Sequence, residues 1–259
     1  MSAVVTERPV RRYVEHVMGM PISLALRGRH TADAAALDAW AEAMATLRDV
    51  DRVFSTYRTD SHVSRLDRGE ITLAACPPEL LEVLALGERW RQESGGAFDV
   101  RRGDASGSFH LDPSGVVKGW AVERAARPLR LLADTDFCLS AGGDMACVAA
   151  PESAPWRVGI EDPLDLDAVV AVVPVRCGAV ATSGLARRGA HITDARTGRV
   201  PTRVASVTVV ADDLVRADLD ATAAFALDAE AATWLAARGS TGVVVWADGR
   251  REVVSAGRG

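Results

Sequence analysis

Closely spaced pairs of short apolar segments constrain the fold of this chain more than any other feature of its sequence. Five such segments follow one another between Phe137 and Thr182, and none of the intervals between them is predicted to be helical. Strands joined by short connections pair as antiparallel hairpins, whereas parallel pairing needs a long crossover. The predicted strands are Val14–Leu26 (one or two strands), Phe137–Ser140, Met145–Ala149, Trp156–Ile160, Val169–Val175, Ala179–Thr182 and Val204–Val210, with a closing hairpin of Gly242–Trp246 and Glu252–Val254.

Helical periodicity appears in the intervals outside that run. From Thr31 to Phe54 apolar residues recur at steps of three and four, which predicts an amphipathic helix capped by Thr31 or Asp33. Hairpins interleaved with helices indicate an α+β fold with a mixed, largely antiparallel sheet. The other predicted helices begin at Pro78 and end at Ser94-Gly95-Gly96, begin near Lys118 and run toward Ala126, and cover Ala217–Leu227 and Ala229–Arg238.

The 259 residues suit a single large domain, which we expect over 13–259 after a flexible segment 1–12. The formal net charge of −5 provides no chain-wide basic surface for nucleic acid. No window approaches the roughly 18 apolar residues of a membrane helix, and the N-terminus has no apolar signal core. We therefore expect no membrane insertion and a cytoplasmic protein.

The four cysteines are Cys76, Cys138, Cys147 and Cys177. They form no CxxC pair, and their spacings match no zinc site. We interpret them as small buried apolar residues of a protein in a reducing compartment.

Several common catalytic motifs are missing: the P-loop sequence GxxxxGK[ST], the zinc motif HExxH and the nucleophile elbow GxSxG. Six clusters of polar residues and glycines remain as candidate binding segments. Paired glycines allow a backbone to approach a ligand, but they also suit a tight turn or a helix C-cap. The clusters are Phe54–Ser64, Ser94–Asp99, Leu111–Ala121, Ser140–Asp144, Ala181–Gly184 with His191–Gly198, and Ala217–Thr222.

Three of these clusters contain side chains with definite chemistry. Lys118 is at a predicted helix start, where its positive charge interacts unfavourably with the helix dipole. This placement is unfavourable unless an anion such as phosphate binds there. His191 and Asp194 suit a base or a polar head group, although Asp194–Gly198 equally suits a β-turn. Asp218 and Thr222 are four residues apart, so both project from one helix face as hard oxygen ligands for Mg²⁺. The alternative is a Thr222 hydroxyl bonded back to its helix, with Asp218 near a helix N-terminus.

In this order, the clusters resemble the FAD:protein FMN transferase family, often called ApbE-type proteins. The matching residues extend over nearly the whole chain, from Met18 to Ala226. They are Met18-Gly19; Phe54-Ser55-Thr56-Tyr57, Asp60-Ser61 and Ser64-Arg65-Leu66; Gly95-Gly96-Ala97-Phe98-Asp99; Val117-Lys118-Gly119 and Ala121-Val122; Gly142-Gly143-Asp144; Ala181-Thr182-Ser183-Gly184; His191-Ile192-Thr193-Asp194 and Thr197-Gly198; and Ala217-Asp218 with Ala221-Thr222-Ala223.

The resemblance implies a cleft for FAD between subregions of the fold. It implies Mg²⁺ ligands at Asp218, Thr222 and the main-chain carbonyl of Val117. His191 corresponds to a family histidine implicated in transfer. Asp194 is predicted to orient His191, and Lys118 is predicted to steady the loop or a phosphate. The predicted FAD contacts are Met18, Ser55, Tyr57, Asp99, Lys118, Gly142, Gly143, Asp144, Thr182, Ser183 and Gly184, with Tyr57 stacking on the flavin.

The chain also departs from the family pattern. Segment Val100–His110 is shorter than expected, and Leu185-Ala186 replaces a common acidic and aromatic pair. Ala195 replaces a usual Pro, and Met20 a frequent Thr. The chain shows no lipoprotein cysteine of the kind that many exported members have, in keeping with the expected cytoplasmic location.

The implied activity is Mg²⁺-dependent transfer of FMN from FAD to a Thr or Ser hydroxyl of an acceptor protein, with release of AMP. The acceptor is expected to present that hydroxyl in a short motif containing Asp and Gly. If water attacks instead, the enzyme is an FAD pyrophosphatase that yields FMN and AMP. A flavin-binding protein without turnover, or an α+β protein with an unrelated ligand, is a further alternative.

Overall fold

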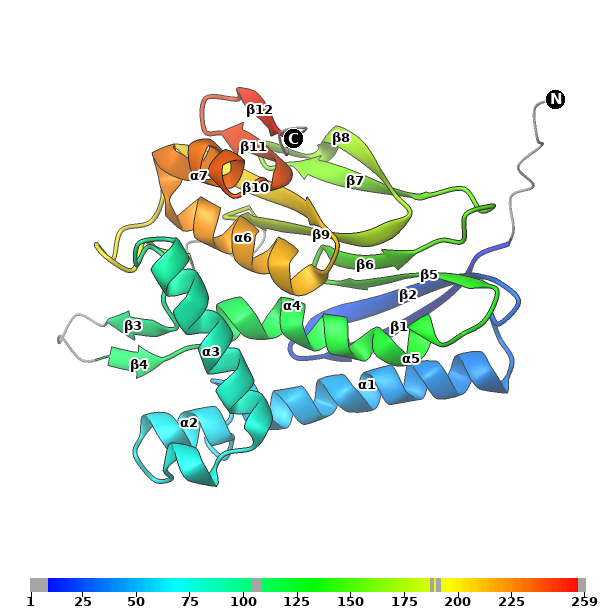
Figure 1. Ribbon diagram of the computed structural model, residues 1–259, viewed down its shortest axis with the longest axis horizontal. Coiled ribbons are helices and arrows are strands. Elements are labelled where there is room, and N and C mark those ends of the chain that lie inside the picture. Colours follow the sequence, from blue (N-terminus) through cyan, green and yellow to red (C-terminus); the bar gives the residue numbers. More distant parts are fainter. Residues whose placement is uncertain (1–8, 104–108, 187–188, 190–191, 256–259) are drawn as a thin grey trace.

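A computed structural model describes residues 9–103, 109–186, 189 and 192–255. An eight-stranded antiparallel sheet with the order β1-β2-β5-β6-β9-β10-β11-β12 forms its centre (Figure 1). Its strands are β1 (Arg11–Val17), β2 (Met20–Gly28), β5 (Thr135–Ala141), β6 (Asp144–Val148), β9 (Cys177–Gly184), β10 (Val204–Ala211), β11 (Thr241–Trp246) and β12 (Arg251–Val254). Two separate hairpins pair β3 (Arg101–Gly103) with β4 (Phe109–Leu111) and β7 (Trp156–Asp162) with β8 (Asp165–Val175).

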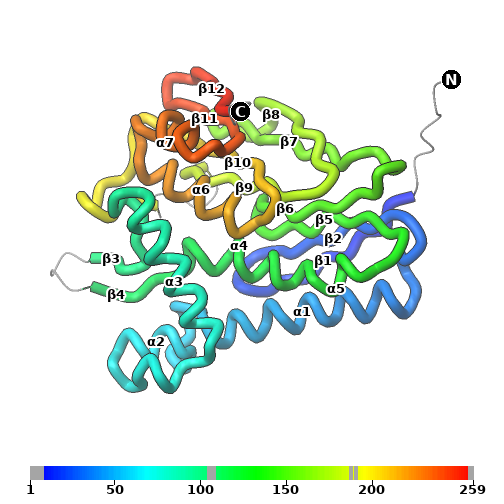
Figure 2. Tube along the Cα trace, viewed as in Figure 1, coloured from blue at the N-terminus to red at the C-terminus, as the bar shows by residue number. Residues whose placement is uncertain are grey.

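Helices α4 and α6 pack directly on this sheet, and α1 packs on α4 and α5 (Figure 2). The helices are α1 (Ala34–Phe54), α2 (His62–Asp67), α3 (Pro78–Glu93), α4 (Ser114–Ala125), α5 (Arg127–Arg130), α6 (Leu214–Ala226) and α7 (Ala231–Ala237), with short 3₁₀ turns η1 (Leu73–Ala75) and η2 (Asp228–Glu230). This arrangement confirms the predicted α+β fold with its largely antiparallel sheet.

The two longest helices begin and end where their sequences indicate. The Asp33 side chain accepts a hydrogen bond from the Ala36 amide at 3.1 Å, so α1 begins at Ala34. Pro78 occupies the first turn of α3, where its missing N–H costs nothing. That helix ends before Gly95 and Gly96, which both have positive φ and allow the Gly96 amide to bond back to a helix carbonyl.

Both faces of the central sheet contribute side chains to a hydrophobic core. In β9, Ala179 and Ala181 belong to the main core beneath the helices. Val180 points the opposite way, into a smaller cluster with Val158 and Val175 of the β7–β8 hairpin. Because successive side chains alternate between faces, one strand serves both clusters. The helices therefore cover one face of the sheet, and the hairpin covers part of the other.

The strand β1 begins at Arg11, and residues 1–8 of the expected flexible segment 1–12 lie outside the described residues. Within the described part of the chain, none of the helices combines the length and apolar character that crossing a membrane requires.

Candidate active site

Two glycine turns lie together at one end of the central sheet. The β1–β2 turn has Met18 and Gly19 at φ 55° and 71°, and the β5–β6 turn has Gly142 and Gly143 at φ 58° and 100°. A Cβ on Gly142 would lie 3.3 Å from the Met20 sulfur, so the two turns are neighbours. Both glycines of the second turn are exposed, which leaves their backbone accessible.

A buried charge cluster lies next to the second turn, where β6 begins. Lys118 Nζ of α4 lies 2.6 Å from Asp144 Oδ2 and 3.3 Å from Asp218 Oδ1 of α6. The other oxygen of each carboxylate accepts a backbone N–H: Thr182 N donates to Asp144 Oδ1 at 3.2 Å, and Gly119 N donates to Asp218 Oδ2 at 2.8 Å. Asp144 and Asp218 are 0% and 1% exposed. Two carboxylates therefore share one ammonium.

Burial and mutual charge set the protonation of this cluster. Burial raises the pKa of Asp144 to about 7, the Lys118 charge opposes this effect, and the Asp218 charge adds to it. Burial acts to lower the pKa of Lys118, but the charges of Asp218 and Asp144 outweigh it and hold that pKa above its ordinary value. Lys118 is therefore a fixed cation.

The position of Lys118 in its helix differs from the prediction. The helix was expected to begin near Lys118, but α4 begins at Ser114, whose amide donates to Asp112 Oδ1 at 3.1 Å. Lys118 therefore lies in the second turn, and two carboxylates compensate its charge. The argument that its charge requires a bound anion was wrong, because sequence alone could not place those carboxylates beside it.

Asp218 and Thr222 project from the same side of α6, as their spacing predicts. The Thr222 hydroxyl lies 2.9 Å from the Ser183 hydroxyl of β9, while Asp218 faces α4. Asp213 caps the helix, since its side chain accepts from Arg216 N. Asp218 is thus well inside α6, and the alternative of a residue near the helix N-terminus is wrong.

The donor types at this position fit Mg²⁺. A carboxylate at Asp218 and hydroxyls at Thr222 and Ser183 are hard oxygen ligands, and Mg²⁺ typically uses few protein ligands together with water and phosphate oxygens. Among the described residues no group of three or more His, Cys, Asp or Glu side chains gathers as a metal cage. Water or phosphate oxygens would have to supply the remaining ligands of a metal ion at this position.

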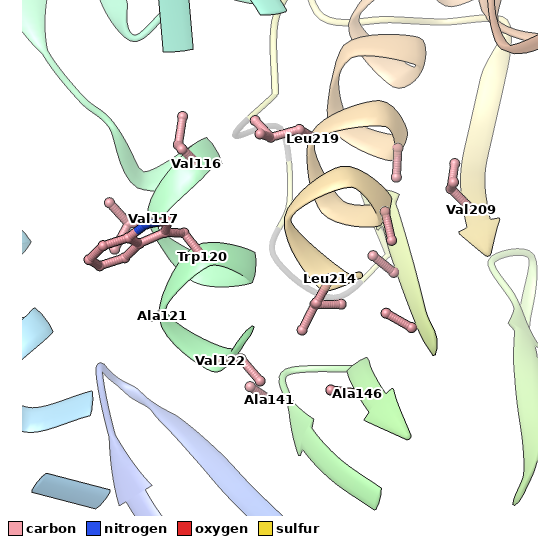
Figure 3. Close-up of a cluster of buried hydrophobic side chains, with 14 of the residues drawn as sticks. Val116, Val117, Trp120, Ala121, Val122, Ala141, Ala146, Val209, Leu214 and Leu219 are labelled. Atoms are coloured by element: carbon pink, nitrogen blue, oxygen red, sulfur yellow. The ribbon is translucent and has the colours of Figure 1, made fainter. Parts of the chain in front are cut away.

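Val117 lies within the first turns of α4, with its side chain buried in the main core on the side of α4 that faces away from α6 (Figure 3). Leu214 and Leu219 of α6 belong to the same cluster. A helical carbonyl usually accepts from the amide four residues later and keeps a second lone pair. The Val117 carbonyl thus belongs to the first turns of α4, one residue before Lys118.

Two loops from distant parts of the sequence are in contact with each other. Ala195 N donates to Ala97 O at 2.9 Å, and the Arg196 side chain lies 3.5 Å from a Cβ position on Gly96. Asp99 in the first loop accepts from Arg101 N at 2.8 Å. The loop 94–99 and the loop 192–199 therefore form one surface.

Asp194 uses its carboxylate within its own loop. Arg196 Nη2 lies 2.8 Å from Asp194 Oδ2, and this hydrogen bond holds the pKa of Asp194 below its usual range. Thr197 N donates to Asp194 O at 3.1 Å, the bond between residues i+3 and i that is typical of a β-turn, which confirms the predicted β-turn in this segment. His191, the predicted base, lies outside the described residues.

The predicted flavin-stacking residue lies in the loop after α1. Tyr57 is 94% exposed, and the preceding Ser55 ends the helix. A cavity of about 380 Å³ opens beside this loop. Its lining residues are Thr56, Ser64, Asp67, Arg102, His110, Leu111 and Asp112. The structure thus brings together the predicted residues of α4, β6, β9 and α6, and Tyr57 lies on a separate exposed loop.

A second buried carboxylate of α6 was missed in the sequence. Asp220 is 0% exposed and accepts from Trp90 Nε1 at 2.9 Å, Arg238 Nε at 3.1 Å and Ser240 Oγ at 2.9 Å. Side chains two residues apart project from different sides of a helix, so Asp220 points away from Asp218. The only signal in the sequence is the pattern Asp-Leu-Asp, which does not distinguish the two roles.

Comparison with known proteins identifies relatives along most of the chain. The sequence profile of the ApbE family matches residues 18–109 and 104–245. The FAD:protein FMN transferase of Rhodobacter capsulatus is 36% identical over 125 residues, which cover 45% of this chain and 24% of that protein. The FAD:protein FMN transferase of Haemophilus influenzae is 26% identical over 265 residues, which cover 78% of this chain and 76% of that protein. The match thus spans about a quarter of the length of the Rhodobacter protein.

The fold is similar to that of a solved flavinyl transferase. The apo crystal structure of Pseudomonas stutzeri ApbE superposes with a TM-score of 0.79, at 21% identity and 98% coverage of both chains. At that identity the similarity concerns the fold.

Proposed function

This chain belongs to the ApbE family, and we propose on that ground that it transfers FMN from FAD to a Thr or Ser hydroxyl of an acceptor protein, with Mg²⁺ as cofactor. One observation carries this proposal. The Asp218 carboxylate and the Thr222 hydroxyl project from the same side of α6, and they contact α4 and β9 respectively. The relatives named FAD:protein FMN transferase supply the substrate class.

The proposed reaction exchanges one phosphorus–oxygen bond for another. The acceptor hydroxyl oxygen attacks the phosphorus on the FMN side of FAD, and the bond from that phosphorus to the bridging oxygen breaks. AMP leaves with the bridging oxygen, and the hydroxyl proton goes to a base. His191 is the proposed base. The Asp194–Arg196 pair stiffens the loop that follows it, so we assign Asp194 to loop positioning.

The proposed metal ligands are Asp218, Thr222 and the Val117 carbonyl. Bound there, Mg²⁺ supplies positive charge that neutralises the pyrophosphate oxygens and orients the phosphorus. The Asp218 carboxylate is already oriented for this role. Gly119 N holds its Oδ2 by a hydrogen bond, and its Oδ1, the oxygen proposed to bind the metal, faces Lys118. Positioning and charge neutralisation account for most of the catalysis in phosphoryl transfer.

The proposed FAD contacts surround this position. Gly142 and Gly143 are exposed, so their backbone N–H groups can donate hydrogen bonds to phosphate oxygens. Backbone N–H groups in turns often bind anions in this way. Met18, Thr182, Ser183 and Gly184 lie at the same end of the sheet. Tyr57 offers an exposed ring for stacking on the flavin, Ser55 precedes it in the same loop, and Asp99 is a further proposed contact from the loop 94–99.

AMP formation from FAD tests this proposal. Chromatography should detect AMP when the protein, FAD, Mg²⁺ and an acceptor peptide with a Thr or Ser near Asp and Gly are combined, and chelation of the metal should stop its formation. AMP with free FMN and an unmodified peptide would indicate the pyrophosphatase instead. FAD that remains intact would indicate a flavin-binding protein.

A further inference from the structure

Lys118 lies between two buried carboxylates that reach it from different elements. Its ammonium is 2.6 Å from Asp144 Oδ2 and 3.3 Å from Asp218 Oδ1. The Lys118 side chain is 17% exposed, whereas those of Asp144 and Asp218 are 0% and 2% exposed. This cation is therefore the main compensation for two charges that have little access to water.

Each carboxylate has one oxygen fixed by the backbone and one directed at Lys118. Gly119 N holds Asp218 Oδ2, and Thr182 N holds Asp144 Oδ1. Among the described residues Asp144 Oδ2 accepts no conventional hydrogen bond, so its contact with the ammonium is its compensation. The oxygens that face Lys118 are thus Asp144 Oδ2 and Asp218 Oδ1.

We infer that Lys118 sets the metal affinity of Asp218, because its ammonium and a divalent cation compete for Asp218 Oδ1, while Asp144 retains the ammonium when the metal binds. This inference rests on the proposed metal role of Asp218. The two contact distances support it, since the Asp144 contact is the shorter one and Coulomb attraction falls with distance. Lys118 can therefore give up Asp218 without losing its closer partner.

The inference makes Lys118 and Asp144 positioning residues with opposite effects. Without Lys118, Asp218 Oδ1 is free and metal binding becomes tighter. Without the charge of Asp144, Lys118 depends on Asp218 alone and metal binding becomes weaker. A simple sum of charges also predicts these two directions, so the single variants are not sufficient to test competition.

The double variant separates competition from net charge. At a pH above the Asp144 pKa of about 7, Lys118→Met with Asp144→Asn removes one positive and one negative charge, so the net charge of the cluster does not change. The amide oxygen of the introduced asparagine can still accept from Thr182 N, and removal of both members of a buried ion pair is often tolerated. Binding of Mn²⁺ in the absence of FAD, measured from the free-ion signal in electron paramagnetic resonance, gives the affinity without any turnover.

Competition predicts that the double variant binds Mn²⁺ about tenfold more tightly than the wild type, as expected when a close cationic competitor is removed. Asp144→Asn alone should bind it more weakly than the wild type. A double variant with wild-type affinity would overturn the inference, because the net charge of the cluster would then be sufficient to explain the Mn²⁺ affinities of all the variants. Absence of Mn²⁺ binding in every variant would also overturn it, whereas AMP release by the wild type tests the proposed reaction separately.

Discussion

The amide of Gly119 donates a hydrogen bond to Asp218 Oδ2 at 2.8 Å, and Gly119 has no space for a side chain. A Cβ at this position would lie 2.7 Å from the Asp218 Cβ and 2.8 Å from the Leu214 carbonyl oxygen. Helices α4 and α6 thus approach each other closely at the carboxylate that we assign to the metal. The residue that orients this carboxylate also fixes the helix spacing.

Replacement of Gly119 by Ala should impair metal binding more than folding. The added methyl pushes α6 away from α4 and breaks the bond to Asp218, so we expect a loss of about 1–3 kcal/mol in the free energy of unfolding and a loss of Mn²⁺ affinity. Urea denaturation and Mn²⁺ titration measure the two effects. Gly87→Ala is the matched control, because its Cβ would lie 2.6 Å from Val100 Cγ1, away from the charge cluster. Equal Mn²⁺ affinities for the two variants would refute the role of Gly119.

The two buried aspartates of α6 should respond differently to the same substitution. Asp218→Asn should abolish metal-dependent AMP release and leave FAD binding, followed by flavin fluorescence, largely intact. Asp220→Asn should leave metal binding intact and reduce stability by about 1–3 kcal/mol, because Asp220 accepts hydrogen bonds from Trp90, Arg238 and Ser240, and an asparagine side chain has one acceptor oxygen instead of two. Unchanged turnover of Asp218→Asn at saturating Mg²⁺ would exclude Asp218 as a metal ligand.

Substitution of Tyr57 separates binding from stability. The ring is 94% exposed, so Tyr57→Ala should change the free energy of unfolding by less than about 0.5 kcal/mol. Loss of stacking on the flavin should weaken FAD binding by about 1 kcal/mol, and Tyr57→Phe should preserve it. If FAD binds Tyr57→Ala as tightly as the wild type, the flavin stacks elsewhere.

Replacement of His191 tests the proposed base. His191→Ala should slow FMN transfer by about 10²–10⁴-fold, the range typical of a lost general base, and change the dissociation constant for FAD much less. Single-turnover kinetics and fluorescence titration give the two quantities. A parallel loss of both would make His191 a binding residue.

The long helices and most hairpins were predictable because their signals are local. Asp33 caps α1, Pro78 begins α3, and Gly95 with Gly96 ends it, and each effect needs only neighbouring residues. Short elements were not predicted. The strands β3 and β4 contain three residues each, too few to show a two-residue period.

The candidate site was predictable only where helical geometry determined it. The spacing of Asp218 and Thr222 placed both on one side of α6 before any tertiary contact was known. The start of α4 was misplaced because Ser114-Gly115 has low helix propensity, although Pro113 and Asp112 begin the helix there. The contacts of Lys118 with Asp144 and Asp218 depend on packing between α4, β6 and α6, and no local pattern specifies them.

The central claim is transfer of FMN to a protein hydroxyl, and the mass of an acceptor peptide tests it most directly. The peptide, with a Thr or Ser near Asp and Gly, would be incubated with the protein, FAD and Mg²⁺, beside a control peptide with Ala in place of the hydroxyl residue. Our account predicts that only the hydroxyl peptide gains the mass of one FMN unit, with an equal amount of AMP released. AMP release with neither peptide modified, or no reaction of FAD at all, would contradict it.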